Sequence, residues 1–323
     1  MDNRITKKRL GHMFSYEWII IIALCVAMVF VWELCYSFFS VKLTAGQQFR
    51  LIYDYKIDDY SAEALMDMFE TENTFSYEVQ EKDFESILKG SDVLNMRHQS
   101  GMCDAIITDA VLTENKKNEK THTRANEIID RYDMYAYDEL VSDAKEYLNS
   151  LKENGDYSEE KIEQGFYKRN SKDNRFRSEE QKKQGLIKEI ARINQLEQDV
   201  LVVEKLLAFD QTQVSGGGES IFYSYKRYTQ SLSESTNKES TTYFENLVAN
   251  EVEQKYGLKL WLLEGSADKK NSANYFRLTS SETDLEKDVV LLIFDMKDKK
   301  HDLQFELISF VATIVREFSD IAG

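Results

Sequence analysis

The chain contains no proline in 323 residues, and this absence limits how its backbone can turn. Average usage of about 5% would give about 16 prolines. Proline kinks and cis prolyl bonds are therefore excluded, and turns must be formed by Gly, Asn, Asp and Ser.

Cysteine is scarce as well. Cys25 and Cys35 lie within one apolar run near the N-terminus, which leaves Cys103 alone in the remainder of the chain. One thiol cannot form an intramolecular disulfide, and no N-x-[ST] glycosylation site is present. An exported domain without disulfides or glycosylation sites is unlike a secreted animal protein and favours a bacterial cell-surface protein.

The common catalytic motifs are missing too. There is no G-x-S-x-G nucleophile elbow and no H-E-x-x-H metal motif, and the glycines 216–218 lack the Lys-Ser/Thr of a phosphate loop. The four histidines lie far apart, without the spacing of metal ligands: His12, His98, His122 and His301. We therefore expect a protein that is not an enzyme, with no metal and no cofactor.

The formal charge is −16, and it is unevenly distributed. Four basic residues precede residue 13, so the rest of the chain is more acidic than the total suggests: Arg4, Lys7, Lys8 and Arg9. An acidic domain repels phosphate backbones, which excludes nucleic acid as a partner held by bulk electrostatics. Such a charge suits a soluble surface domain, or one that binds a cationic ligand.

One long apolar run, Trp18–Phe39, predicts where the chain is attached. As a helix it spans roughly 33 Å, enough to cross a hydrocarbon core about 30 Å thick. Residues 18–41 are therefore predicted to be a transmembrane helix that binds the lipid bilayer. A cleaved signal peptide is the alternative, but the best cleavage site, 43–45, has Leu where a small residue is needed.

Basic residues flank this run mainly on its N-terminal side. The positive-inside rule then places residues 1–17 in the cytoplasm as a basic tail. Residues 42–323 are predicted to lie outside the cell, as the extracellular domain of a single-pass cell-membrane protein.

The first part of this domain alternates strand and helix patterns. Strands are predicted at Phe49–Ile57, Phe75–Val79 and Cys103–Leu112, with helices at 61–69 and Phe84–Arg97 between them. A β-α-β-α-β order is typical of a parallel sheet with crossover helices.

The middle of the chain is charged and helical. Helices are predicted at 125–151, 158–168 and 178–209, and the last has apolar residues every three or four positions. These residues are Leu186, Ile190, Ile193, Leu196, Val200, Val203 and Leu207. They predict a face packed against neighbouring helices; a coiled-coil dimer is the alternative.

The C-terminal part returns to strands. We expect a strand at Ile221–Tyr228, a helix at Tyr243–Tyr256, a buried strand at Val289–Phe294 and a final helix at Leu303–Phe318. The fold class is therefore α/β with some α+β character.

Two segments carry a resemblance to a known family. They are DVLNMRHQSGMCDAIITDAV (Asp92–Val111) and DVVLLIFDMKDKKHDLQFELISFVATIVREF (Asp288–Phe318). Together with the element order, they resemble the type 2 solute-binding proteins of bacterial transporters. The resemblance implies two lobes: residues 42–115 plus 258–323 as an α/β lobe, and residues 116–257 as a mostly helical second lobe, an insertion that is more charged than the family's usual second lobe.

Candidate ligand residues follow from the predicted sheet. Ligands bind beyond the carboxyl ends of parallel strands, where Tyr53, Asp54 and Tyr55 end the first strand, and Thr108 and Asp109 end the third. Aromatic rings and acids together suit a sugar or a cationic solute, whereas the alternative is an ordinary strand end.

The resemblance and the missing catalytic motifs predict a membrane-anchored, solute-binding-like domain without catalysis. Such a domain would recognise a small molecule or assist a membrane complex. The alternative function is a structural or scaffolding surface protein that docks a protein partner through its helical section.

Glu33 is the one charged residue inside the apolar run. It lies roughly 22 Å along the helix from Trp18, in the outer third of the hydrocarbon layer. A carboxylate at the centre of a spanning helix costs about 3 kcal/mol on insertion scales, and less towards the interface. Glu33 therefore contacts a polar group on a partner membrane protein, lies among the headgroups, or is protonated.

The partner-contact interpretation makes a prediction. Glu33→Leu should leave membrane insertion intact but reduce the co-purification of a membrane partner, because the polar contact is gone. Glu33→Gln, which keeps a hydrogen-bonding head, should lose less. Equal recovery of the same partners by wild type and Glu33→Leu, measured by quantitative mass spectrometry, would show that Glu33 is only an interfacial residue.

Overall fold

The structure is a computed structural model of the chain. It describes residues 11, 18–39, 43–55, 59–87, 92–110, 123–171, 173–232, 247–271, 275–276 and 289–321. Residues Met1–Lys42 and Leu43–Gly323 form two separate compact units, which are described in turn.

The first unit contains one long helix, α2, at Trp18–Phe39. Its apolar side chains are exposed on all sides, which is the pattern of a membrane-spanning helix rather than of a helix with one core-facing stripe. Among the described residues it is the single helix that is long and apolar enough to cross a membrane. The finding is consistent with single-pass anchoring, while the orientation stays a prediction.

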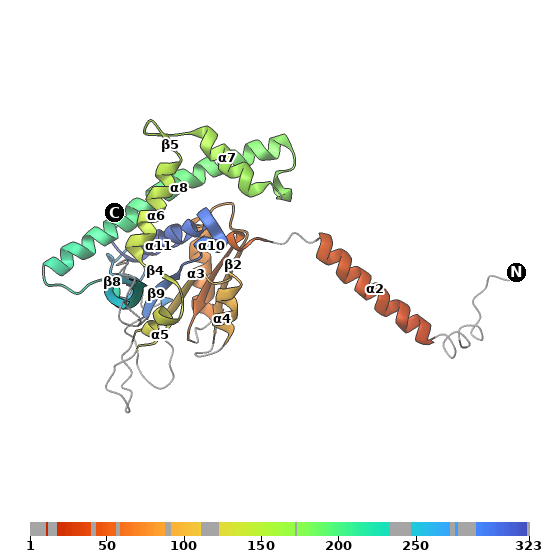
Figure 1. Cartoon of the computed structure of the whole chain (residues 1–323), viewed down its shortest axis with the longest axis horizontal. Helices are drawn as coiled ribbons and strands as arrows, with labels where there is room; N and C mark the ends of the chain where they lie inside the picture. Colours follow the sequence, from red (N-terminus) through yellow and green to blue (C-terminus); the bar gives the residue numbers. More distant parts are fainter. Residues whose placement is uncertain are drawn as a thin grey trace, which may run out of the picture. The chain divides into compact units, whose positions relative to one another are not determined.

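The second unit is built around a seven-stranded mixed sheet (Figure 1). The strands follow one another in the order β2-β1-β3-β9-β8-β7, and the short β4 pairs with β9. Their bounds are β1 Gln48–Tyr53, β2 Glu81–Ser86, β3 Ala105–Asp109, β4 Met134–Tyr135, β7 Phe222–Leu232, β8 Leu247–Lys259 and β9 Val289–Phe294.

The β-α-β-α-β prediction is confirmed. Both β2 and β3 pair with β1 in parallel, and they are connected through α3 (Asp59–Thr71) and α4 (Asp92–Gln99). The connection from β1 to β2 and the connection from β2 to β3 run across the sheet in opposite directions. Right-handed crossovers therefore place α3 and α4 on opposite faces of the sheet. Their buried residues accordingly belong to two different core clusters.

Two boundaries in this region were predicted wrongly. The second strand lies at Glu81–Ser86 rather than at Phe75–Val79, and α4 begins at Asp92 rather than at Phe84. Residue Phe84 is in the strand and pairs with Leu51 of β1. β2 is an edge strand with charged residues, so it lacks the apolar run that marks a buried strand.

The strand β9 is buried completely and lies in the middle of the sheet. It is antiparallel to β3 on one side and to β8 and β4 on the other. All six side chains are buried, and alternate ones enter the two core clusters. The predicted strand Val289–Phe294 is therefore confirmed to the residue.

Helices cover both faces of the sheet, which makes three layers (Figure 1). One face is covered by α3 with α6 (Tyr137–Ser150), α8 (Glu179–Ser215) and α11 (Glu306–Phe318). The other face is covered by α4 and α5 (Arg124–Arg131). Phe49, Phe69 and Phe310 join strand, crossover helix and final helix in the larger core, with ring centroids 4.8–4.9 Å apart at Phe310.

The helical section projects away from the sheet with α7 (Glu159–Asn170) and a small hairpin (Figure 1). The hairpin strands β5 (Lys152–Glu153) and β6 (Asp156–Tyr157) are joined by Asn154 and Gly155, which both have positive φ angles. Such a two-residue turn needs positive φ at both positions, and Asn-Gly is the sequence that best provides it.

Several short helices complete the structure. They are η1 Ala45–Gln47, η2 Asn174–Phe176, η3 Leu260–Leu262, α10 Lys297–Lys300 and η4 His301–Phe305. The turn η4 leads directly into α11, so the predicted final helix Leu303–Phe318 begins in the structure with a 3-10 turn.

The long helix α8 packs its predicted apolar face into the core. Ile193, Leu196, Val200 and Val203 are buried against the larger core cluster, which confirms the core-face interpretation. The helix begins at a capping box of two hydrogen bonds. The Ser178 hydroxyl accepts from the backbone amide of Gln181, and the Gln181 side-chain oxygen accepts from the backbone amide of Ser178.

The predicted helix Tyr243–Tyr256 is wrong over its described part, because residues 247–256 belong to β8. Val248, Val252 and Tyr256 are spaced by four, a spacing that fits one face of a helix and also one side of a strand. Pairing with β7 along eleven residues decides between the two.

The mixed helix-and-sheet class is confirmed, whereas the two-lobed arrangement stays a prediction. Helices from residues 116–257 pack on the same sheet as the strands of the predicted first lobe. Both β7 and β8 also belong to that sheet.

Candidate functional site

The carboxyl ends of β1 and β3 meet, as the parallel sheet predicts. Thr108 Oγ1 donates a hydrogen bond of 3.2 Å to Asp54 Oδ2. The guanidinium of Arg124, at the start of α5, donates to the same oxygen at 2.6 Å. Because Asp54 is fully buried, this arginine supplies the counter-ion that a buried carboxylate needs. The sequence identified the acid but not its partner.

The other candidate residues at this edge are also buried. Tyr53 and Tyr55 pack edge-on, with ring centroids 5.8 Å apart, and burial raises the pKa of both phenols. Tyr55 Oη contacts the carbonyl of Phe276 at 3.4 Å. Asp109 is buried at the end of β3. The structure thus gathers the predicted residues at one edge and packs them into the core, and their role in binding stays a prediction.

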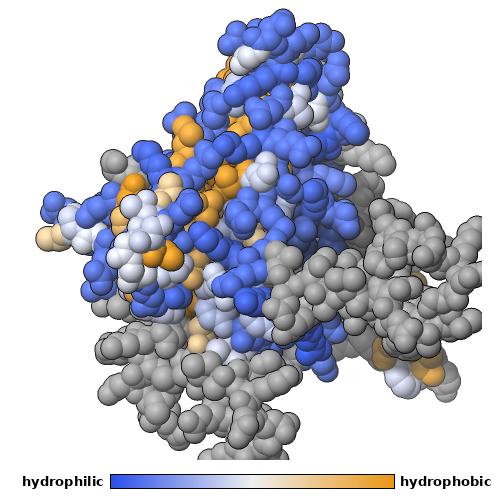
Figure 2. Space-filling model, turned by 60° about the vertical axis from the view of Figure 1, so that its left-hand side comes forward, coloured by the Kyte–Doolittle hydropathy of each residue, from blue (hydrophilic) through white to orange (hydrophobic). Residues whose placement is uncertain are grey.

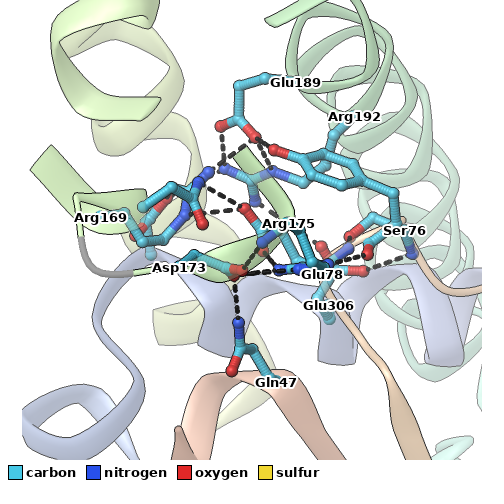
Figure 3. Close-up of polar contacts among 12 residues, drawn as sticks. Gln47, Ser76, Glu78, Arg169, Asp173, Arg175, Glu189, Arg192 and Glu306 are labelled. Atoms are coloured by element: carbon cyan, nitrogen blue, oxygen red, sulfur yellow. Dashed lines mark hydrogen bonds and ion pairs between the residues drawn. The ribbon is translucent and has the colours of Figure 1, made fainter. Parts of the chain in front are cut away.

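A second group of polar residues was not predicted. It is a partly buried network of arginines and carboxylates where the loop before β2, α7, α8 and η4 meet (Figure 3). We call it the arginine–carboxylate network, and its members are Glu78, Arg169, Asp173, Arg175, Glu189, Arg192, Asp302 and Glu306.

Arg169 and Arg192 hold the network together. Arg169, on α7, contacts Glu78 at 3.2 Å and Glu189 at 2.6 Å, and it also pairs with Asp302. Arg192 lies one turn after Glu189 on α8 and binds it through Nε at 3.1 Å and Nη2 at 2.7 Å. The same Nη2 reaches Asp302 at 2.9 Å. Two helices and the turn η4 are thereby joined.

Arg175 extends the network towards the start of the domain. Its Nη2 contacts Glu78 and Asp173, each at 2.8 Å. Asp173 in turn accepts a hydrogen bond of 3.0 Å from the side chain of Gln47, in the turn before β1. The network therefore connects the helical section to the first strand of the sheet.

The charges of the network do not balance, because five carboxylates face three arginines. Burial alone disfavours the ionised form of Glu189, but the charges and hydrogen bonds of Arg192 and Arg169 outweigh it and lower its pKa to about 2. Burial dominates at Glu306, where it raises the pKa despite Arg192. Glu306 thus differs from Glu189, because the arginines do not outweigh its burial.

A cavity of about 370 Å³ adjoins the network at Arg192 and Glu306. It lies between the turn at 73–77 and the faces of α8 and α11 that meet there. Its lining residues are Asn73, Thr74, Ser76, Tyr77, Lys188, Ala191, Arg192, Gln195, Leu196, Glu306 and Ser309. Helical spacing explains this set, since 188, 191, 192 and 195 share one side of α8, and 306 and 309 share one side of α11.

Some polar groups in this cavity have unused hydrogen-bonding capacity. Arg192 Nη1 has one close partner in the described part of the chain, Glu306 Oε1, at 3.6 Å, which is beyond hydrogen-bond range. Ser309 is 6% exposed, and its hydroxyl makes no hydrogen bond to any described residue. Lys188, at the rim, makes no ion pair there either.

Sequence patterns contained little signal for this site. Glu189 and Arg192 are three residues apart, which is the spacing of an ordinary surface ion pair on a helix. Arg169 and Arg175 lie in a stretch that is basic and polar throughout. Only the folded chain shows that these residues are buried together.

The outer face of α8, defined by Ile187, Leu201 and Phe209, forms a further surface; Val214, also exposed and apolar, lies on the opposite side of the helix. Six large apolar side chains are exposed among the described residues after 43, and four of them are on α8: Ile187, Leu201, Phe209 and Val214. Figure 2 turns forward the side towards which the C-terminal half of α8 extends, and it shows hydrophobic residues in a band among hydrophilic ones. The membrane candidate Glu33 is exposed on α2, and its partner stays a prediction.

Comparison with family models, curated proteins and solved structures finds no match to this chain.

The lowered pKa of Glu189 predicts how stability depends on pH. Its folded-state pKa of about 2 lies below the ordinary 4.5, so the ionised form stabilises the fold above pH 4.5, and this contribution is lost as pH falls towards 2. The shift corresponds to about 3 kcal/mol. Glu189→Gln should therefore be less stable than wild type at pH 7, and this difference should shrink by about 3 kcal/mol between pH 5 and pH 2.

Denaturation of the full chain in detergent micelles, followed by circular dichroism, measures this difference. Glu264→Gln is the matched control, because Glu264 is exposed and makes no ion pair among the described residues. A Glu189→Gln difference that stays constant with pH would contradict the assigned ion pairs.

Proposed function

We propose that this protein is a membrane-anchored, non-catalytic domain that recognises a small solute in the cavity beside the arginine–carboxylate network. One observation carries the proposal. Two buried residues, Arg192 and Ser309, line this cavity, and neither Arg192 Nη1 nor Ser309 Oγ makes a hydrogen bond to a described residue.

Neither atom is among the fully buried unpaired atoms of the described residues, so both stay accessible from the cavity, where water or a ligand can bind to them. A guanidinium edge and a hydroxyl that remain open in a cavity therefore favour a ligand or water there. The volume of about 370 Å³ lies within the range of small-molecule sites, and apolar Leu196 and Ala191 complete the wall. Arg192 is held by Glu189 and Asp302, so its free edge is fixed before any ligand binds.

The apolar helix α2 supports attachment to a membrane. In this proposal the N-terminal tail is cytoplasmic and residues 42–323 face the outside of a bacterial cell, as the basic residues before Trp18 predict. The solute would then be taken from the extracellular medium.

A thermal-unfolding screen of the full chain in detergent micelles tests this proposal. Sugars, polyamines, short peptides and amino acids form the panel. We expect one class to raise Tm further at each higher concentration, because a ligand at about 100 times its Kd stabilises by about 2.7 kcal/mol. Ser309→Ala should reduce this Tm shift by removing a hydroxyl from the cavity.

The control is Ser215→Ala, at the exposed end of α8, which should leave the Tm shift unchanged. A panel in which no class raises Tm would overturn solute binding at this cavity.

A second function is favoured by the outer face of α8. Lys205 lies on the same side of α8 as Ile187, Leu201 and Phe209, and the two acids at the edge of this side, Glu197 and Glu204, are paired with Lys152 and Lys145. In a chain of net charge −16 this face is complementary to an apolar helix with acidic flanks. We propose such a helix of a membrane-associated partner as its occupant.

Site-specific photo-crosslinking in cells tests the docking proposal. A photoreactive residue at Leu201 or Phe209 should crosslink to a peptide with an apolar face and acidic flanks, identified by mass spectrometry. The same residue at Met96, an exposed apolar position on α4, should not. Crosslinks that are equal at the three positions, or absent from α8, would remove this second function.

A further inference from the structure

We infer that the cavity is built for a small zwitterion whose ammonium and carboxylate groups are adjacent, which is the head group of an α-amino acid. This inference rests on the proposed function and names the ligand class of the same cavity.

The spacing of two opposite charges carries the inference. Arg192 Nη1 and Glu306 Oε1 lie 3.6 Å apart in the cavity wall, and both side chains are at least nine-tenths buried. Standard bond lengths place the ammonium nitrogen and a carboxylate oxygen of an α-amino acid about 3 Å apart. Such a head group fits against the pair in the opposite sense, with its carboxylate at Arg192 and its ammonium at Glu306.

Neither protein group can satisfy the other fully. Nε and Nη2 of Arg192 are used by Glu189, Asp302 and Tyr147. Ser76 donates to the Glu306 carboxylate from its backbone amide, at 3.0 Å from Oε2, and from its side chain. Both residues line the cavity, and at 3.6 Å Arg192 Nη1 and Glu306 Oε1 do not hydrogen-bond to each other, so a ligand can form a charge-assisted hydrogen bond to each.

Other lining residues extend both halves of this arrangement. Lys188 is one turn before Arg192 on α8 and adds a second cation on the carboxylate side. Gln195 donates its side-chain amide to Asp199, which leaves its carbonyl oxygen free to accept from an ammonium group. Ser309 supplies a hydroxyl that can donate or accept.

This charge pattern also selects against simpler ions. A plain carboxylic acid would meet the carboxylate of Glu306, and a plain amine would meet Lys188 and Arg192. A bound ammonium would in addition stabilise the ionised form of Glu306, whose pKa burial raises in the free protein. The remaining volume, beside Leu196 and Ala191, can take an uncharged ligand side chain.

Calorimetric titration of the full chain in detergent micelles tests the ligand class. The twenty L-amino acids are titrated first, and the tightest is then compared with its deaminated acid and its decarboxylated amine; for L-leucine these are 4-methylpentanoate and isoamylamine. We expect each analogue to bind at least tenfold more weakly than the amino acid, because each leaves one protein charge unpaired.

A substitution at Glu306 separates this assignment from a merely structural role. Glu306→Gln keeps the side-chain size but removes the charge, so the deaminated acid should bind more tightly than to wild type while the amino acid binds more weakly. Glu317→Gln, further along α11 and paired with Lys270, should leave both affinities unchanged.

The outcomes are distinguishable. An analogue that binds as tightly as the amino acid, or a Glu306→Gln variant with the wild-type preference, overturns the zwitterion assignment. If only sugars or polyamines stabilise the chain in the thermal screen, this inference fails and the proposed function stands. If no solute binds, both fail.

Discussion

The domain depends on β9, Val289–Phe294, the strand at the centre of its sheet. On one side it completes the parallel β1–β3 unit, and on the other it holds the long β7–β8 pair and the short β4. Its alternate side chains enter both hydrophobic cores, so each helical layer rests on it. A strand buried on both faces has no polar position, which is why its sequence, VVLLIF, is apolar throughout.

The parts of the fold that could be predicted from sequence are those whose pattern has one structural solution. A fully apolar six-residue run, a 22-residue apolar helix and the apolar face of α8 were placed correctly because burial alone determines them. The edge strand β2 and the strand β8 were missed for a different reason. The charged residues of β2 and the evenly spaced apolar residues of β8 fit a helix as well as a strand. Pairing with β1 and with β7 makes both segments strands.

The site shows the same limit. The meeting of Asp54 and Thr108 was predictable, because it follows from parallel strands ending at one edge. The arginine–carboxylate network was not, because its members lie in segments that each look solvent-exposed when taken alone. Removal of one member leaves other buried charges unpaired, so these residues stabilise the contact between the helical section and the sheet only as a set.

The position of β9 also determines when the domain can form during synthesis. In chain order β9 follows α2, β1 to β3 and β7–β8, so all of these elements leave the ribosome before the strand that joins them. Until then the two halves expose unpaired strand edges, a state prone to misassembly. In a membrane-anchored chain, insertion of α2 can therefore begin while the second unit is still incomplete, and the sheet of that unit closes only after translation of β9.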